Sequence, residues 1–87
     1  MKIILHKNFT KQYKKLRSNE KEKFQEIRNI FLKNPFHPLL HNHPLHGEYA
    51  GYRSISITGD LRVLYEPIDE QTAYFITIGR HRNLYHG

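Results

Sequence analysis

The sequence predicts one small α+β domain in which two N-terminal helices pack on an antiparallel sheet, in the order β-α-α-β-β-β. Apolar residues recur at helical spacing over residues 7–34 and alternate with polar residues from residue 52 onward. The length of 87 residues allows only one modest core. Residues 1–87 are therefore expected to form a single domain.

The first predicted elements are a strand and a helix. Residues 2–6 form a short apolar run that reads as a strand. Phe9, Tyr13 and Leu16 follow at i, i+4 and i+7, the spacing of one helix face, and Asn8 or a neighbour is expected to cap that helix.

A second helix is expected between Ser18 and Asn34. Ser18 is a good N-terminal cap, and the residue before Pro35 avoids the helical conformation. One face of this helix would be apolar and consists of Phe24, Ile27, Ile30 and Phe31. The helix pair should therefore lie on a sheet as a hairpin.

The second half is predicted to be a long loop followed by three antiparallel strands. Residues 35–51 are rich in proline, histidine and glycine, which favours a loop. Strands are expected at 52–57, 61–66 and 72–78, with turns at 58–60 and 67–71. Gly79 is expected to end the last strand, and residues 80–87 to form a short tail.

Positive charge is concentrated in the N-terminal part of a chain whose net charge is +6. Residues 1–34 hold ten Lys or Arg against three Glu, whereas the remainder holds four Arg against five acidic residues. A single lysine of this kind usually belongs to a solvated helix face. The asymmetry as a whole predicts a nucleic acid or an acidic protein as partner, because a one-sided field attracts polyanions.

The composition excludes several classes of function. The chain has no cysteine, so it can form neither a disulfide framework nor a thiolate metal site, and it has no thiol nucleophile. The apolar run at the N-terminus is too short for a signal peptide, and no stretch has the length of a membrane span. We therefore expect a cytoplasmic protein with no membrane association.

Six of the seven histidines follow residue 36, which indicates either metal binding or proton transfer. His41, His43 and His46 resemble a metal-binding tract, but Pro44 interrupts their spacing, and no carboxylate lies between them to complete a site. We expect no metal and no other cofactor.

Metal-free RNA cleavage fits the remaining polar residues. RNA carries its own nucleophile, the 2′-hydroxyl, so the protein must supply only a base, an acid and cations for the phosphate. The C-terminal half supplies these residue types as His43, Asp60, Arg62, Arg80, His81 and Arg82. Arg62, in an otherwise apolar strand, could instead form a salt bridge, and Tyr85 could either stack on a base or anchor the tail.

Four motifs in order resemble one toxin superfamily. They are His43-Pro44-Leu45-His46-Gly47, Gly51-Tyr52-Arg53-Ser54-Ile55, Asp60-Leu61-Arg62-Val63-Leu64-Tyr65 and Ile78-Gly79-Arg80-His81-Arg82-Asn83-Leu84-Tyr85. Together they resemble the RelE/ParE toxins of type II toxin–antitoxin systems, most closely the YafQ-type messenger-RNA interferases. The resemblance implies a RelE-like (microbial RNase-like) fold, ribosome-dependent mRNA cleavage and a cognate antitoxin as partner.

The resemblance also implies roles for particular residues. His43, Asp60, His81 and Tyr85 match the YafQ-type pattern, and Arg62 matches an arginine of the RelE branch. We expect His81 to donate the proton to the leaving group, and His43 or Asp60 to accept the 2′-proton. Arg62 and Arg80 would steady the phosphate. RNA binding is assigned to Tyr85, Arg82, Arg53, Lys11, Lys14 and Lys15.

Three positions depart from the YafQ-type pattern. Ser56, Leu61 and Thr77 stand where that pattern has histidine, tryptophan and arginine. Arg62 and Arg80 could substitute for the missing cation, but nothing obvious replaces the histidine. Two alternatives therefore stay open: a ParE-like toxin that acts on DNA gyrase without cutting nucleic acid, and a catalytically weak module that binds RNA or an antitoxin.

Overall fold

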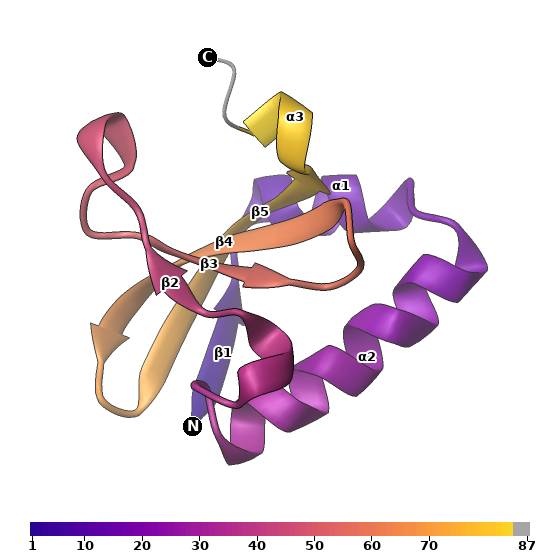
Figure 1. Cartoon of the computed structure of the whole chain (residues 1–87). Helices are drawn as coiled ribbons and strands as arrows, with labels where there is room; N and C mark the ends of the chain where they lie inside the picture. The colour runs from indigo at the N-terminus through magenta and orange to yellow at the C-terminus, as the bar shows by residue number, and fades with distance from the viewer. Residues whose placement is uncertain (85–87) are drawn as a thin grey trace.

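The computed structural model describes residues 1–84, and a five-stranded sheet in the order β1-β5-β4-β3-β2 organises them (Figure 1). In chain order the elements are β1 (Lys2–Leu5), α1 (Lys7–Lys14), α2 (Ser18–Lys33), the 3-10 turn η1 (Pro38–Leu40), β2 (His43–Pro44), the 3-10 turn η2 (Gly47–Tyr49), β3 (Arg53–Ser56), β4 (Leu61–Asp69), β5 (Thr72–Arg80) and α3 (His81–Leu84).

The predicted α+β class, with two N-terminal helices against a sheet, is confirmed. The sheet is mixed, however, and not wholly antiparallel. Strands β2 to β5 pair antiparallel as predicted, but β1 lies parallel to β5, with Lys2 opposite Thr72 and Leu5 opposite Phe75. Periodicity along the sequence cannot show this direction, because an apolar run looks the same whichever way its partner runs.

The caps of α1 and α2 lie two residues before Asn8 and one residue before Ser18, respectively. His6 caps α1, since its Nδ1 accepts a hydrogen bond from the N–H of Asn8 at 3.0 Å. Arg17 precedes α2, and its N–H donates to the Glu20 carboxylate at 3.1 Å, while Ser18 is already helical. The predicted end of α2 before Pro35 is confirmed, because the helix stops at Lys33.

Strand boundaries shift by a few residues from the prediction. Strand β4 runs through Pro67 to Asp69 instead of turning at Pro67, and a register shift between these two residues accommodates the proline. Strand β5 continues through Gly79 to Arg80 instead of ending at Gly79. Residues 81–84 of the expected tail form the short helix α3, and the long loop contains the two-residue strand β2.

The core lies between the sheet and helices α1 and α2 and is built largely from aromatic rings. Phe9, Phe24, Phe31 and Tyr65 all place their ring centroids within 6.3 Å of the Phe75 ring. These rings are buried, which favours the packed state through loss of apolar surface to water. The aromatic core therefore fixes α1 and α2 on one face of the sheet, here called the helical face.

Strand β4 separates the helical face from the opposite face, here called the distal face. Leu61, Val63 and Tyr65 belong to the core on the helical face. Successive side chains of a strand point to opposite sides, so Arg62 and Leu64 point to the distal face. The predicted alternation along residues 52–57 is confirmed in the same way, since Ile55 and Ile57 are buried in the core.

Candidate active site

Arg62 is held on the distal face by a neighbouring strand. Its Nη1 donates a hydrogen bond to Ser56 Oγ at 2.8 Å, and the two residues lie directly opposite each other in the β3–β4 pairing. None of the salt bridges within residues 1–84 includes Arg62, so the alternative of a cross-strand ion pair does not hold there. Its Nε is buried and has no hydrogen-bond partner among the described residues. Arg62 therefore keeps an unsatisfied donor that suits an anion.

A hollow of about 550 Å³ joins Arg62 to His43. The hollow lies along the edge of β3, and we call it the β3-edge hollow. Ser56 and Arg62 line it from the sheet, His43 from β2, and Lys23 from α2. Two of the predicted active-site residues, one histidine and one arginine, thus border the same cavity.

The geometry of His43 suits a proton acceptor. Its Nδ1 lies 2.8 Å from the backbone carbonyl oxygen of His41. A carbonyl oxygen can only accept, so this contact requires the proton on Nδ1 and leaves a lone pair on Nε2 of the neutral ring. His43 is therefore held in the tautomer that a general base needs.

Helix α3 folds back over the distal face next to Arg62. Gly79 lies opposite Arg62 in the β4–β5 pairing, and a Cβ added at Gly79 would lie 3.3 Å from Leu84 Cδ2. Tyr49 Oη donates to the carbonyl of Leu84 at 2.9 Å and ties α3 to η2. The tail helix therefore covers the row of the sheet that carries Arg62.

His81 begins this helix beside the β3–β4 turn. Its N–H donates to the carbonyl oxygen of Asp60 at 2.8 Å. Residues three apart on a helix share one side, so His81 lies on the same side of α3 as Leu84, which packs against Gly79. The backbone of the predicted proton donor is thus fixed two residue positions along the sheet from the Arg62–Gly79 pair.

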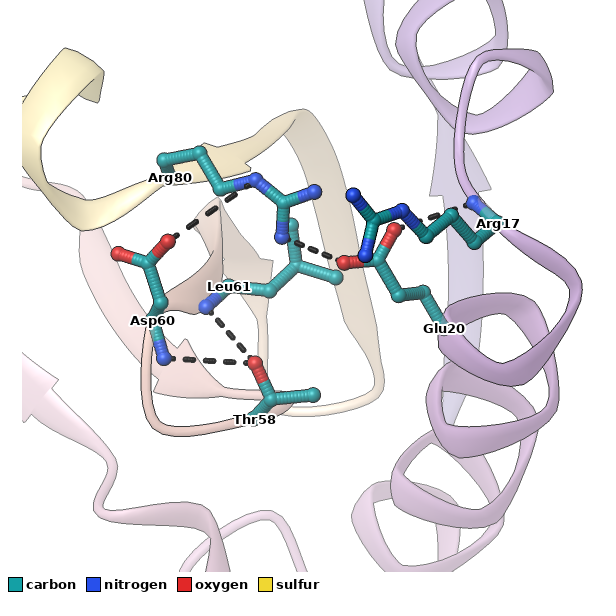
Figure 2. Close-up of polar contacts among 6 residues, drawn as sticks. All are labelled: Arg17, Glu20, Thr58, Asp60, Leu61 and Arg80. Atoms are coloured by element: carbon teal, nitrogen blue, oxygen red, sulfur yellow. Dashed lines mark hydrogen bonds and ion pairs between the residues drawn. The ribbon is translucent and has the colours of Figure 1, made fainter.

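Arg80 lies apart from this group, on the helical face. It pairs with Leu61 across the strands, and its Nη1 donates to Glu20 Oε2 on α2 at 2.5 Å (Figure 2). Its Nε lies 3.9 Å from Oδ2 of the Asp60 carboxylate, in the β3–β4 turn. The structure therefore does not bring Arg80 together with Arg62 and His43; Arg80 links α2 to the β3–β4 turn.

The ion pair changes the acid–base properties of both partners. The hydrogen bond from Arg80 is the largest cause that lowers the pKa of Glu20, and the N–H of Arg17 lowers it further. The same hydrogen bond raises the pKa of Arg80. Both groups are therefore more firmly charged than usual, as expected of a structural contact between elements.

Four of the residues predicted to bind RNA, Arg53 and three lysines in or just after α1, do not lie on the distal face with Arg62. Arg53 lies opposite Tyr65 on the helical face, donates to Asn42 Oδ1 at 2.7 Å and stacks over the Phe36 ring at 5.2 Å. Lys11, Lys14 and Lys15 are exposed in and after the last turn of α1, and Arg82 is exposed on α3. Tyr85 lies outside the described residues.

Asn42 is a site-forming residue that sequence reasoning missed. Its Nδ2 donates to the carbonyl of Pro35 at 2.7 Å and to Tyr65 Oη at 2.8 Å, while its Oδ1 accepts from Arg53. This network anchors the segment that carries His43 to the core. No signal in a single sequence distinguishes Asn42 from an ordinary loop asparagine.

Gln12 and Glu20 were also missed, although both join distant elements. Gln12 Oε1 accepts from Thr77 Oγ1 at 2.7 Å and from the N–H of Ile78 at 3.0 Å, so it attaches α1 to β5. Glu20 follows Arg17 at the spacing of a capping carboxylate, a signal that would have identified its local role but not its bond to Arg80.

Within residues 1–84, no three His, Asp or Glu side chains gather as metal ligands would. None of the helices there is long and apolar enough to cross a membrane.

A family model described as a bacterial toxin of type II toxin–antitoxin systems, YafQ, matches residues 1–86. The chain belongs to the YafQ toxin family. It is thus a toxin of the type II class, and the RelE/ParE resemblance noted from its motifs is confirmed.

Solved structures agree with this assignment. YafQ from Escherichia coli strain BL21(DE3) is 21% identical, with a TM-score of 0.80 over 95% of this chain and 96% of that one. A YoeB/ParE toxin from Agrobacterium tumefaciens is 26% identical, with a TM-score of 0.77 over 93% and 99%. The E. coli DinJ-YafQ toxin–antitoxin complex gives 21% identity and a TM-score of 0.76 over 95% and 94%. No curated protein sequence matches the chain.

We predict that Glu20→Gln lowers the stability of the fold near neutral pH and makes that stability less sensitive to a fall in pH. The pKa of Glu20 is lowered from its ordinary value of 4.5, so its contribution to stability is complete above pH 4.5 and is lost as the pH falls toward the lower folded-state pKa. Removing the charge should lower the free energy of unfolding near neutral pH by about 1 kcal/mol. Urea denaturation on both sides of pH 4.5 measures this.

The matched control is Glu22→Gln, an exposed position on the same helix. Its stability should follow the wild-type pH profile. If Glu20→Gln and the wild type lost stability in parallel below pH 4.5, the Arg80 contact would not be the source of the acid sensitivity.

We predict that Asn42→Ala lowers the free energy of unfolding by about 1–3 kcal/mol, because Tyr65 Oη and the carbonyl of Pro35 lose their partner. Asn29→Ala, at an exposed position of α2, should change stability by less than about 0.5 kcal/mol. Chemical denaturation compares the two variants. Equal effects would show that the network around Asn42 does not stabilise the loop.

Proposed function

We propose that this toxin is a metal-independent endoribonuclease that cuts mRNA on the ribosome, in the cytoplasm. In this reaction the 2′-hydroxyl attacks the adjacent phosphate and the 5′-oxygen of the next nucleotide leaves. The single observation that carries the proposal is the pairing of Arg62 and His43 at one hollow, where Arg62 keeps a buried, unpartnered Nε.

Arg62 is suited to the phosphate. Ser56 Oγ accepts a hydrogen bond from Nη1 and fixes the guanidinium at the hollow, where its positive charge can face a phosphate. Such a contact strengthens as negative charge grows on the pentavalent phosphorane, so it lowers the barrier and not only the energy of the bound substrate.

His43 is the proton acceptor in this scheme and His81 the proton donor. His43 is preferred to Asp60 as base because its Nδ1–H is fixed by the His41 carbonyl and its Nε2 is free to accept. The Asp60 carboxylate instead faces Arg80, while its carbonyl holds the N–H of His81. Asp60 therefore acts on the reaction by positioning the tail, and Arg80 by fixing the turn to α2.

A cognate antitoxin is proposed as the regulatory partner. The E. coli relative has been solved as a toxin–antitoxin complex, DinJ-YafQ, and this chain has the same fold over nearly its whole length. The positive charge of residues 1–34 suits both an acidic antitoxin and ribosomal RNA.

His81→Ala should reduce mRNA cleavage by about 10²–10⁴-fold, because a positioned proton donor contributes about that much. His43→Ala should lose a similar factor, and Arg62→Lys should stay well below the wild-type rate because an ammonium lacks the planar guanidinium that Ser56 fixes at the hollow. Mapping of mRNA ends on translating ribosomes measures all three, with circular dichroism to verify folding.

The matched control is His46→Ala, an exposed histidine that does not line the β3-edge hollow. It should cut at close to the wild-type rate. Cleavage at the wild-type rate by folded His81→Ala would refute the assigned donor. Loss of DNA supercoiling by gyrase without any cut mRNA would favour the ParE-like alternative.

A further inference from the structure

Within the described residues, no strand pairs with the outer edge of β3 next to the β3-edge hollow. Strand β2 pairs only with Arg53 and Ser54. In this register His41 would have to lie opposite Ser56, but His41 adopts a left-handed conformation, with φ of 49°, and turns the chain away. Within residues 1–84, Ser56 therefore has β4 on one side and no strand on the other.

The backbone of Ser56 faces the hollow. The N–H of Ile57 bonds to Leu61 on β4, whereas the carbonyl of Tyr52 accepts from Leu45 on the other side. Backbone groups alternate in direction along a strand, so the N–H and C=O of Ser56 point the same way as those of Tyr52, toward the hollow. This edge offers one hydrogen-bond donor and one acceptor side by side.

The other walls of the hollow combine apolar surface with positive charge. Ile27 and Ile30 contribute one apolar wall, and Leu39, which is 61% exposed, contributes another. Lys23 and Arg62 supply cations. Glu26 also lines the hollow, but its carboxylate lies 3.6 Å from Lys23 Nζ, so Lys23 partly offsets that charge.

We infer that the β3-edge hollow binds the base of the nucleotide next to the scissile phosphate, and that the Ser56 backbone reads the edge of that base. The inference rests on the proposed RNA cleavage and adds the source of its base preference. The volume of about 550 Å³ is within the range of small-ligand sites, and apolar walls suit the faces of a base. Ser56, which stands where the YafQ-type pattern has histidine, keeps the hollow open.

RNA is favoured over a peptide as the occupant because of charge. An extended peptide could also add to the free edge of β3, since strand addition uses the same backbone groups. The cations Lys23 and Arg62, with His41 and His43 alongside, suit a phosphate-bearing chain better. A peptide that occupies this edge is therefore the rival outcome of the test.

The first experiment measures cleavage of a pool of mRNAs that differ only in the base next to the cut. Leu39→Ala and Lys23→Glu both change the hollow at exposed positions, so the fold should tolerate them. Leu39→Ala should reduce the rate ratio between the best and the worst base several-fold, because the base loses an apolar wall that holds its edge against the Ser56 backbone. Lys23→Glu should slow cleavage of every sequence.

Controls on the same helix match each change. Leu32→Ala and Lys33→Glu alter an exposed leucine and an exposed lysine of α2 that do not line the hollow. Both should keep the wild-type rate and base preference. An unchanged base preference in folded Leu39→Ala would overturn the inference, even if cleavage itself is confirmed.

The second experiment does not depend on cleavage. Each of the four nucleoside 5′-monophosphates is titrated into the wild-type protein while amide chemical shifts are recorded. The Ser56 amide should shift most with one preferred base, and Leu39→Ala should weaken that response. Such shifts without any RNA cleavage would contradict the proposed function but support base binding in the β3-edge hollow. Shifts at Ser56 that appear only with an antitoxin peptide would overturn the subsite.

Discussion

The alternation of side chains along β4 is the constraint on which the rest of the molecule depends. Leu61, Val63 and Tyr65 are buried against the helices, while Arg62 points to the distal face. A slip of one residue in the pairing of β4 would bury Arg62 in the aromatic core and expose three large apolar side chains. The register that stabilises the core is therefore the same register that puts a guanidinium beside the hollow.

The two faces of the sheet divide the tasks of stability and chemistry. Aromatic packing around Phe75 and the bonds of Gln12 and Glu20 all act on the helical face or at its rim. The distal face carries Ser56, Arg62 and Gly79, with α3 folded over it. Polar groups can remain unsatisfied there because the helical face already holds the domain together, an arrangement common at functional sites.

Elements with strong local patterns could be predicted from the sequence. The helix around Phe24 and Phe31, its end before Pro35 and the three antiparallel strands were all predicted, because periodicity and proline act locally. Arg62 and His43 could also be selected as candidate site residues, since their residue types fit the chemistry and the motifs. The parallel pairing of β1 and the cap at His6 could not, because each depends on a neighbour that the pattern does not specify.

Arg80 shows that membership of a motif does not specify which face of the sheet a charged side chain occupies. It adjoins His81 in the chain but points to the opposite face, where Glu20, sixty residues earlier, is its partner. Nothing in the sequence indicates that Arg80 and His81 lie on different faces of the sheet. The face of a strand residue can be read from its neighbours, whereas its distant partner requires the tertiary structure.

The pairing of β1 with β5 affects the order in which the chain can fold during synthesis. Lys2 leaves the ribosome well before its partner Thr72 is made, because seventy positions separate the two residues in the chain. Until then β1 has no strand to join, and α1 and α2 lack the Phe75 ring on which they pack. A nascent toxin therefore cannot complete its sheet, or place Arg62 and α3 together, before β5 and α3 have emerged.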